Sequence, residues 1–171
     1  MTTMLRVELG RLSREGSVLV EASIPAEDSL WDECGIEWDG AVDVRVQAAF
    51  AGSGEVVARG SARGWLRQEC RRCLKAVRTP FEGELTLVFV EAGTVLEEGD
   101  GFAFDPMGGE LDMSSALREE LVLAVNPYVV CDPGCLGLCP QCGIDLNEGS
   151  CECREEGVDP RWEALRKLKG R

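Results

Sequence analysis

The sequence predicts an α+β fold in which an antiparallel β-sheet or a partly closed barrel, with a few short helices, precedes a cysteine-rich C-terminal segment. Three observations predict it: polar and apolar residues alternate over the first ninety positions, one amphipathic helical pattern follows, and eight of nine cysteines form close pairs. The 171 residues therefore divide into a β-rich core domain with one amphipathic helix, residues 1–130, and a cysteine-rich segment with a C-terminal helix, residues 131–171.

Strands are expected where residues of alternating polarity lie between glycines. The run Val42–Gln47 alternates strictly, as a half-buried strand does. Two longer arms, Glu55–Gln68 and Lys75–Val90, would form a hairpin with Cys70 and Cys73 at its tip. Further runs of strand character are Leu5–Leu9, Val18–Ala22, Glu55–Leu66 and Glu84–Val90.

Helices are expected after a Gly-rich, acidic stretch, residues 91–110, that reads as a loop. Asp112 or Ser114 can cap the first helix, and Asn126-Pro127 ends it. Its apolar stripe consists of Leu117, Leu121, Ala124 and Val125. A second, short helix would begin at Asp159-Pro160 and direct Trp162, Leu165 and Leu168 to one side.

The cysteine pairs have the spacing of metal ligands. Two thiolates two to four residues apart can bind one tetrahedral zinc ion, and two such pairs complete a closed, structural four-sulfur site. Eight ligands suit two structural Zn²⁺ ions in a zinc-ribbon-like arrangement. The predicted ligands are Cys70, Cys73, Cys131, Cys135, Cys139, Cys142, Cys151 and Cys153.

Chain order suggests which pairs share an ion. Gly143, after the second cysteine of Cys139-x-x-Cys142, can adopt the left-handed conformation that turns amide N–H groups toward thiolates, and Cys151-x-Cys153 follows closely. The pair Cys70-x-x-Cys73 lacks this glycine, and its natural partner is Cys131-x-x-x-Cys135, some sixty residues on. Alternatives are four disulfides in a secreted chain, a redox dithiol, or iron–sulfur clusters.

Catalysis through side chains is restricted by composition. The chain has no histidine, which excludes Ser–His and Cys–His catalysis and histidine-containing zinc sites. The Gly-rich stretches lack the flanking pattern of a phosphate-binding loop. We expect Trp31, Trp38 and Cys34 to pack in the core, while Trp65, between two arginines, is a candidate base-stacking residue. A non-enzyme without a small-molecule substrate is therefore expected.

Charge is distributed unevenly along this acidic chain, whose net charge is −13. Residues 59–78 carry seven basic groups and one acidic group, whereas residues 79–160 carry two and eighteen. The basic segment could bind nucleic acid, or it could offset the formal charge of −2 on a four-thiolate zinc centre. The candidate nucleic-acid-binding residues are Arg63, Arg67, Arg71, Arg72, Lys75 and Arg78, with Arg59 at the start of the same segment.

Neither an apolar run of membrane-spanning length nor the apolar centre of a signal peptide occurs in the sequence. We therefore expect a cytoplasmic location with no membrane partner, where thiols stay reduced and metal is favoured over disulfides.

Ordered motifs in the second half of the chain resemble those of a known family. They are CRRCL, LREELVLAVNP, CDPGCLGLCPQCGIDLNEGSCEC and VDPRWEALRKL, over roughly residues 60–170. This order is similar to that of the YceD family, long catalogued as a domain of unknown function and linked to accumulation of 23S ribosomal RNA. The resemblance implies a bacterial, cytosolic, non-enzymatic factor that supports synthesis, processing or stability of this RNA. The family's paired cysteines coincide with the eight named above.

Two mechanisms fit this expectation. The basic hairpin could contact phosphates of ribosomal RNA or its precursor, with a steep dependence on salt. Alternatively, the acidic surface could bind a basic ribosomal protein or a nuclease. Two other classes stay open, namely a zinc-dependent nuclease or hydrolase, and a zinc-ribbon adaptor unrelated to ribosomes.

Overall fold

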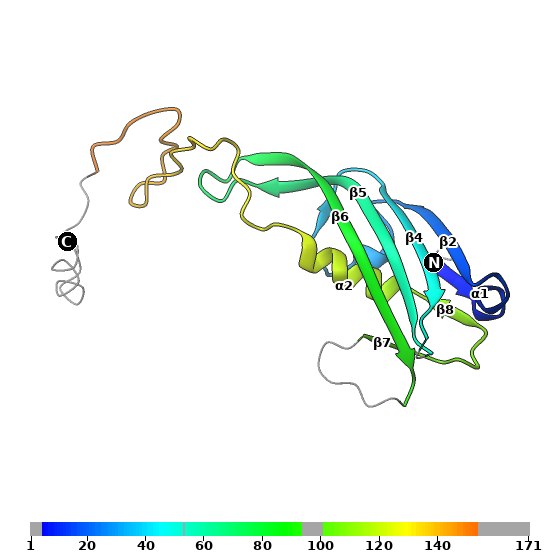
Figure 1. The fold of residues 1–171 in the computed structure, drawn as a ribbon. Coiled ribbons are helices and arrows are strands. Elements are labelled where there is room, and N and C mark those ends of the chain that lie inside the picture. Colours follow the sequence, from blue (N-terminus) through cyan, green and yellow to red (C-terminus); the bar gives the residue numbers. More distant parts are fainter. Residues whose placement is uncertain (1–4, 53, 94–100, 154–171) are drawn as a thin grey trace, which may run out of the picture.

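The computed structural model describes residues 5–52, 54–93 and 101–153, and its centre is a twisted, open sheet (Figure 1). Neighbouring strands are antiparallel except for the parallel pair β6–β7. A second sheet pairs β1 (Arg6–Glu8) with β8 (Glu110–Asp112). The strands of the large sheet, in order, are β2 (Ser17–Ile24), β4 (Val42–Phe50), β5 (Val56–Glu69), β6 (Ala76–Glu91) and β7 (Phe102–Phe104), with β3 (Glu37–Trp38) also paired to β5.

The sheet has one buried and one solvent-exposed face because its strands alternate in polarity. In β4 every second side chain from Val42 to Ala48 is buried, and the intervening ones are exposed. The α-helices α1 (Leu9–Glu15) and α2 (Ser114–Ala124) and the short 3-10 helix η2 (Ser29–Trp31) contribute to the core. The predicted stripe of α2 is confirmed at Leu117 and Leu121, which are buried, whereas Ala124 is exposed.

The hairpin β5–β6 is the longest element and determines where the cysteines lie. Its strands pair continuously from Val56–Phe89 to Glu69–Ala76, so the turn contains Cys70 and Cys73 as predicted. After α2 the chain runs past this turn and continues away from the sheet as an irregular segment (Figure 1). The expected β-rich architecture with an appended cysteine-rich segment is confirmed, and of the two alternatives the open sheet is the observed one, without a closed barrel.

Several local expectations were wrong. The strand expected over Leu5–Leu9 is confirmed at Arg6–Glu8 but ends there, because Leu9 begins α1. The stretch 91–110, expected to be a loop, contributes β7 and the start of β8. Both strands are three residues long. β8 pairs with the distant β1, and β7 pairs in parallel with the end of β6, so local composition does not reveal them. At α2 neither predicted residue is the N-cap, which is Met113, although the Asp112 carboxylate accepts a hydrogen bond from the Ser114 N–H at 2.9 Å.

The helix expected from Asp159 lies outside the described residues. Within the described ranges, no helix is long and apolar enough to cross a membrane.

Candidate metal centres

The turn of the β5–β6 hairpin, residues 70–75, is a compact backbone knuckle. The Leu74 N–H donates to the Cys70 carbonyl at 2.9 Å, and the Cys70 N–H donates to the Lys75 carbonyl at 2.8 Å. Closing this turn places Leu74 in the left-handed region, with φ of 60°. A leucine pays a steric penalty there that a glycine would not.

Residues 139–144 repeat the same knuckle in the irregular segment. The Gly143 N–H donates to the Cys139 carbonyl at 2.9 Å, and the Cys139 N–H donates to the Ile144 carbonyl at 2.9 Å. Gly143 has φ of 73°, which confirms the left-handed conformation expected from its sequence. The two knuckles, called the hairpin knuckle and the loop knuckle below, thus share one backbone design.

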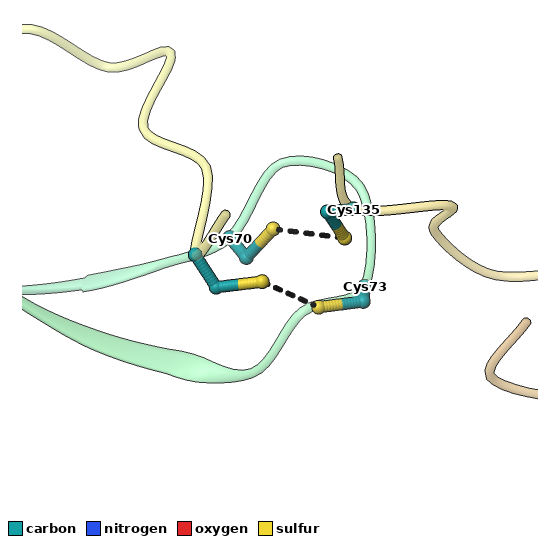
Figure 2. A group of neighbouring side chains, drawn as sticks. Cys70, Cys73 and Cys135 are labelled. Carbon is teal, nitrogen blue, oxygen red and sulfur yellow. Dashed lines mark hydrogen bonds between the residues drawn. The ribbon is translucent and has the colours of Figure 1, made fainter. Parts of the chain in front are cut away.

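Each knuckle gains a second cysteine pair from further along the chain. In each resulting group of four, the sulfur atoms all lie within 4.8 Å of one another. Figure 2 shows that the side chains of Cys70, Cys73 and Cys135 in the first group converge on one another. This grouping confirms the pairing inferred from chain order. The hairpin tetrad is Cys70, Cys73, Cys131 and Cys135, and the loop tetrad is Cys139, Cys142, Cys151 and Cys153.

The sulfur spacing suits a single tetrahedral ion. Metal–sulfur bonds of about 2.3 Å at the tetrahedral angle place sulfurs roughly 3.8 Å apart. The Sγ atoms of Cys70 and Cys135 are 3.9 Å apart, and those of Cys73 and Cys131 are 3.6 Å apart. All nine cysteines are free thiols, so the disulfide alternative is not what this structure shows. Four soft sulfur donors without oxygen or nitrogen ligands also exclude a site designed for Mg²⁺ or Ca²⁺.

Backbone amides favour the thiolate form of one cysteine in each tetrad. The backbone N–H of Cys131, with those of Cys73 and Arg72, lowers the pKa of Cys70 to about 6. The N–H groups of Cys142 and Gln141 likewise lower the pKa of Cys139 to about 6.

The opposite shift occurs at one thiol of each second pair. Hydrogen bonds with neighbouring cysteines, Cys73 first, raise the pKa of Cys131 to about 12. Those with Cys142 and its neighbours raise the pKa of Cys153 to about 12. Four thiolates in close contact repel one another unless a cation lies among them. A bound divalent metal ion would supply this positive charge.

The two tetrads differ in burial. Cys70, Cys73 and Cys135 are buried, and they pack with Val77, Val130 and Leu138 in a small apolar cluster of their own. In the loop tetrad only Cys139 is buried, Cys151 is half-buried, and Cys142 and Cys153 are exposed.

Most cations predicted to bind nucleic acid already have partners within the protein. On the exposed face of the sheet, the Arg63 guanidinium lies 2.6 Å from the Glu82 carboxylate. Arg67 and Arg78 both donate to Asp39, and these hydrogen bonds, that from Arg78 first, lower the pKa of Asp39. Arg78 also stacks on Trp65, with its guanidinium carbon 3.8 Å from the ring centroid, while Trp31 and Trp38 are buried as expected.

The remaining predicted cations lie at the hairpin knuckle. Lys75 pairs with Glu148 at 2.7 Å and with Asp145 at 3.1 Å. Arg72 donates to the backbone carbonyls of Cys135 at 2.8 Å and Pro133 at 3.2 Å, so it holds the second cysteine pair against the turn. These contacts give Lys75 and Arg72 roles within the protein itself, through carboxylates and backbone carbonyls.

Arg71 differs from these cations. Its guanidinium lies 5.4 Å from the ring centroid of Tyr128, and no described carboxylate forms an ion pair with it. Tyr128 is largely exposed. Sequence reasoning missed Tyr128 because it is 57 positions away and no motif marks it; only the course of the chain after α2 brings the two together.

Comparison with known proteins identifies the family. The family described as large ribosomal RNA subunit accumulation protein YceD matches residues 58–169, which include the hairpin and all eight paired cysteines. The chain belongs to this family. The resemblance inferred from its motifs is therefore confirmed.

Individual relatives are of two kinds. An uncharacterized protein of Mycobacterium tuberculosis is 33% identical over 133 residues, 75% of this chain and 61% of the relative. A chloroplastic large ribosomal RNA subunit accumulation protein YCED homolog 1 of Arabidopsis thaliana is 33% identical over 70 residues, 41% of this chain and 22% of its own length. The homolog of Zea mays is 25% identical over an alignment covering 99% of this chain and 66% of the relative. The chain thus spans about three fifths of the mycobacterial relative, and no solved structure matches it.

Proposed function

We propose that this protein is a non-enzymatic, cytoplasmic ribosome-biogenesis factor that supports accumulation of large-subunit (23S) ribosomal RNA, with one structural Zn²⁺ ion in each cysteine tetrad. The observation that carries the proposal is the pair of closed four-sulfur groups within a YceD-family chain. Free thiols throughout are in keeping with a reducing compartment.

Zinc fits the donor set better than the other metals considered. The sulfur spacing is that of a mononuclear tetrahedral site, and the inorganic sulfides of an iron–sulfur cluster would need the cysteines further apart. Bound zinc would supply a cross-link, joining Cys70 and Cys73 of the hairpin to Cys131 and Cys135 across 58 to 65 residues.

A structural role for the ions favours a non-enzyme. A catalytic zinc keeps one position for water or substrate, whereas four cysteines fill the tetrahedral shell. The chain also has no histidine to serve as a general base at neutral pH.

Charge favours a basic protein as the immediate partner. The chain carries a net charge of −13, and of the six cations first assigned to RNA contact, Arg63, Arg67, Lys75 and Arg78 already face carboxylates. Each exposed ion pair is weak, about 0–1 kcal/mol, so phosphates could compete for one of them. Displacing four while bringing RNA to an acidic surface is less favourable than binding a cationic ribosomal protein or a nuclease.

Direct RNA contact is a second candidate, and Arg71 with Tyr128 is the observation that favours it. An exposed aromatic ring beside a guanidinium that pairs with no described carboxylate can stack a base and contact a phosphate. In this version the RNA-contacting surface is these two residues rather than the whole basic segment.

The test is ultraviolet crosslinking of the tagged protein in cells, with sequencing of recovered RNA and identification of co-purified proteins. We expect a basic ribosomal protein or a nuclease to co-purify in a salt-sensitive manner, and 23S RNA to fall relative to 16S RNA on depletion of the factor. Unchanged 23S levels would contradict the proposed function. Crosslinks to 23S precursor that vanish in Arg71→Glu but persist in Arg14→Glu, a charge reversal on α1, would instead establish direct RNA contact.

A further inference from the structure

The side chain of Asn147, in the stretch of chain between the loop-tetrad cysteines Cys142 and Cys151, contacts the hairpin tetrad. The Asn147 Nδ2 donates to the Sγ of Cys135 at 3.5 Å. Asn147 lies between Cys142 and Cys151, within the stretch of chain that the loop tetrad closes, whereas Cys135 belongs to the hairpin tetrad. A residue fixed by one candidate metal site thus hydrogen-bonds a ligand of the other.

The orientation of the Asn147 amide follows from its neighbours. Its Oδ1 accepts a hydrogen bond from the Leu136 N–H at 2.8 Å, and a backbone N–H can only donate. The NH₂ group is therefore the one turned toward sulfur. It also donates to the Asp145 carboxylate at 2.6 Å, which holds the amide in place.

Backbone contacts bring the two knuckles together around this bond. The Leu138 N–H donates to the Arg72 carbonyl at 3.0 Å, and the Leu146 N–H donates to the Gly137 carbonyl at 2.9 Å. Gly137 has φ of 78°, and a Cβ there would lie 2.9 Å from the Arg72 carbonyl oxygen. The hairpin knuckle and the residues before Cys139 thus approach more closely than a side chain at position 137 would allow.

Apart from the hydrogen bonds just named, the described contacts that hold the loop segment in this position are exposed. Around the loop knuckle, Ile144 and Leu136 are exposed, and the ion pairs of Lys75 with Asp145 and Glu148 lie at the surface. Exposed ion pairs contribute little, and ordering a segment of this length is costly in conformational entropy. Closure of the loop tetrad, whose cysteines flank Asn147 in the sequence, would therefore help to hold Asn147 in place.

We propose that Asn147 is a positioning residue that couples the two tetrads, so that metal bound in the loop tetrad strengthens metal binding in the hairpin tetrad. This inference rests on the proposed occupancy of both tetrads by metal. An N–H···S bond stabilises a metal-bound thiolate, and contacts of this kind to metal ligands typically change affinity about 10–100-fold. Because coupling of binding equilibria is reciprocal, hairpin occupancy strengthens the loop site by the same factor.

The experiment uses the full chain loaded with ¹¹³Cd²⁺, whose NMR resonance reports each four-thiolate site separately. Chelator competition then gives the affinity of each site. Asn147→Asp keeps the acceptor for the Leu136 N–H but replaces the NH₂ group with a carboxylate oxygen facing sulfur. We expect a hairpin site weakened about 10–100-fold. Asn126→Asp is the matched control, because the Asn126 side chain accepts from the Tyr128 N–H and its amide donates to no described sulfur.

A double-mutant cycle with Cys139→Ser/Cys142→Ser decides whether the effect is coupling. We expect the serine pair alone to weaken the hairpin site by a similar factor, and Asn147→Asp to have no further effect in that background. Independent, additive effects of the two changes would overturn the proposal, as would an unaltered hairpin resonance and affinity in both Asn147→Asp and Asn147→Ala.

The proposed metal content is tested separately by the first titration. Two resonances in the wild-type chain establish two four-thiolate sites whether or not they are coupled. Fewer than two would contradict the proposed occupancy, whereas two sites of unchanged affinity in the Asn147 variants would contradict only the coupling.

Discussion

The hairpin knuckle and the loop knuckle have the same backbone hydrogen bonds and different surroundings. The first caps the long β5–β6 hairpin, and three of its tetrad's four cysteines are buried. The second lies in an irregular segment whose single pair of bridging residues is Leu138 with Asp145 among the described residues. With metal bound, two knuckles of the same backbone design would therefore serve two purposes. The hairpin tetrad would fasten a segment to a sheet that is already ordered, and the loop tetrad would order the residues around itself.

Removing the cysteines of each knuckle should have the largest effect on stability and should separate the two roles most clearly. Cys70→Ser with Cys73→Ser should release one zinc ion and lower the free energy of unfolding by about 3–5 kcal/mol, since a cross-link over some 60 residues is lost. Cys139→Ser with Cys142→Ser should also release one ion but cost the sheet only about 1–2 kcal/mol through the coupled hairpin site. Denaturant unfolding followed by the fluorescence of the buried Trp31 and Trp38 measures both. Equal losses in the two variants would show that the knuckles do not differ in role.

A chelator should remove metal from the two tetrads at different rates. The loop tetrad has two exposed sulfurs and one half-buried sulfur, so we expect its ion to leave first, at least about tenfold faster than the hairpin ion. Zinc release measured with a colorimetric indicator should show two phases. The serine pair at Cys139 and Cys142 should lack the fast phase, and a single phase in the wild-type chain would be the contrary result.

The smallest expected effect concerns the residue that closes each turn. Leu74 occupies the conformation that Gly143 occupies at no steric cost, so Leu74→Gly should raise the free energy of unfolding by about 0.5 kcal/mol. Gly143→Ala should lower the stability of the loop segment by about 1 kcal/mol, measured by amide hydrogen exchange. Leu74→Ala is the control, because it shortens the side chain but keeps the strain. A gain with alanine equal to that with glycine would show that strain is not the cause.

Much of the metal-binding arrangement could be predicted because it is local in sequence. Cysteine spacing indicates the ligands, alternation indicates the hairpin, and Gly143 indicates the second turn. The same local reasoning failed for β7 and β8, which are three residues long and whose pairing it did not indicate, and at Leu9, where the expected strand gives way to α1. It gave no indication that Leu74 would adopt a glycine conformation, since closure of the hairpin turn imposes it.

Residue type and spacing were enough to indicate the family, the eight candidate sulfur ligands, their grouping in two sets of four, and the position of the first pair at a hairpin tip. The tertiary structure was needed to show which cations form ion pairs, because Asp39, Glu82, Asp145 and Glu148 reach their partners across strands and loops. It was also needed to show which tetrad is buried and that the Asn147 amide donates to the Cys135 sulfur. Chain packing brings these residues together, and sequence spacing does not reveal such contacts.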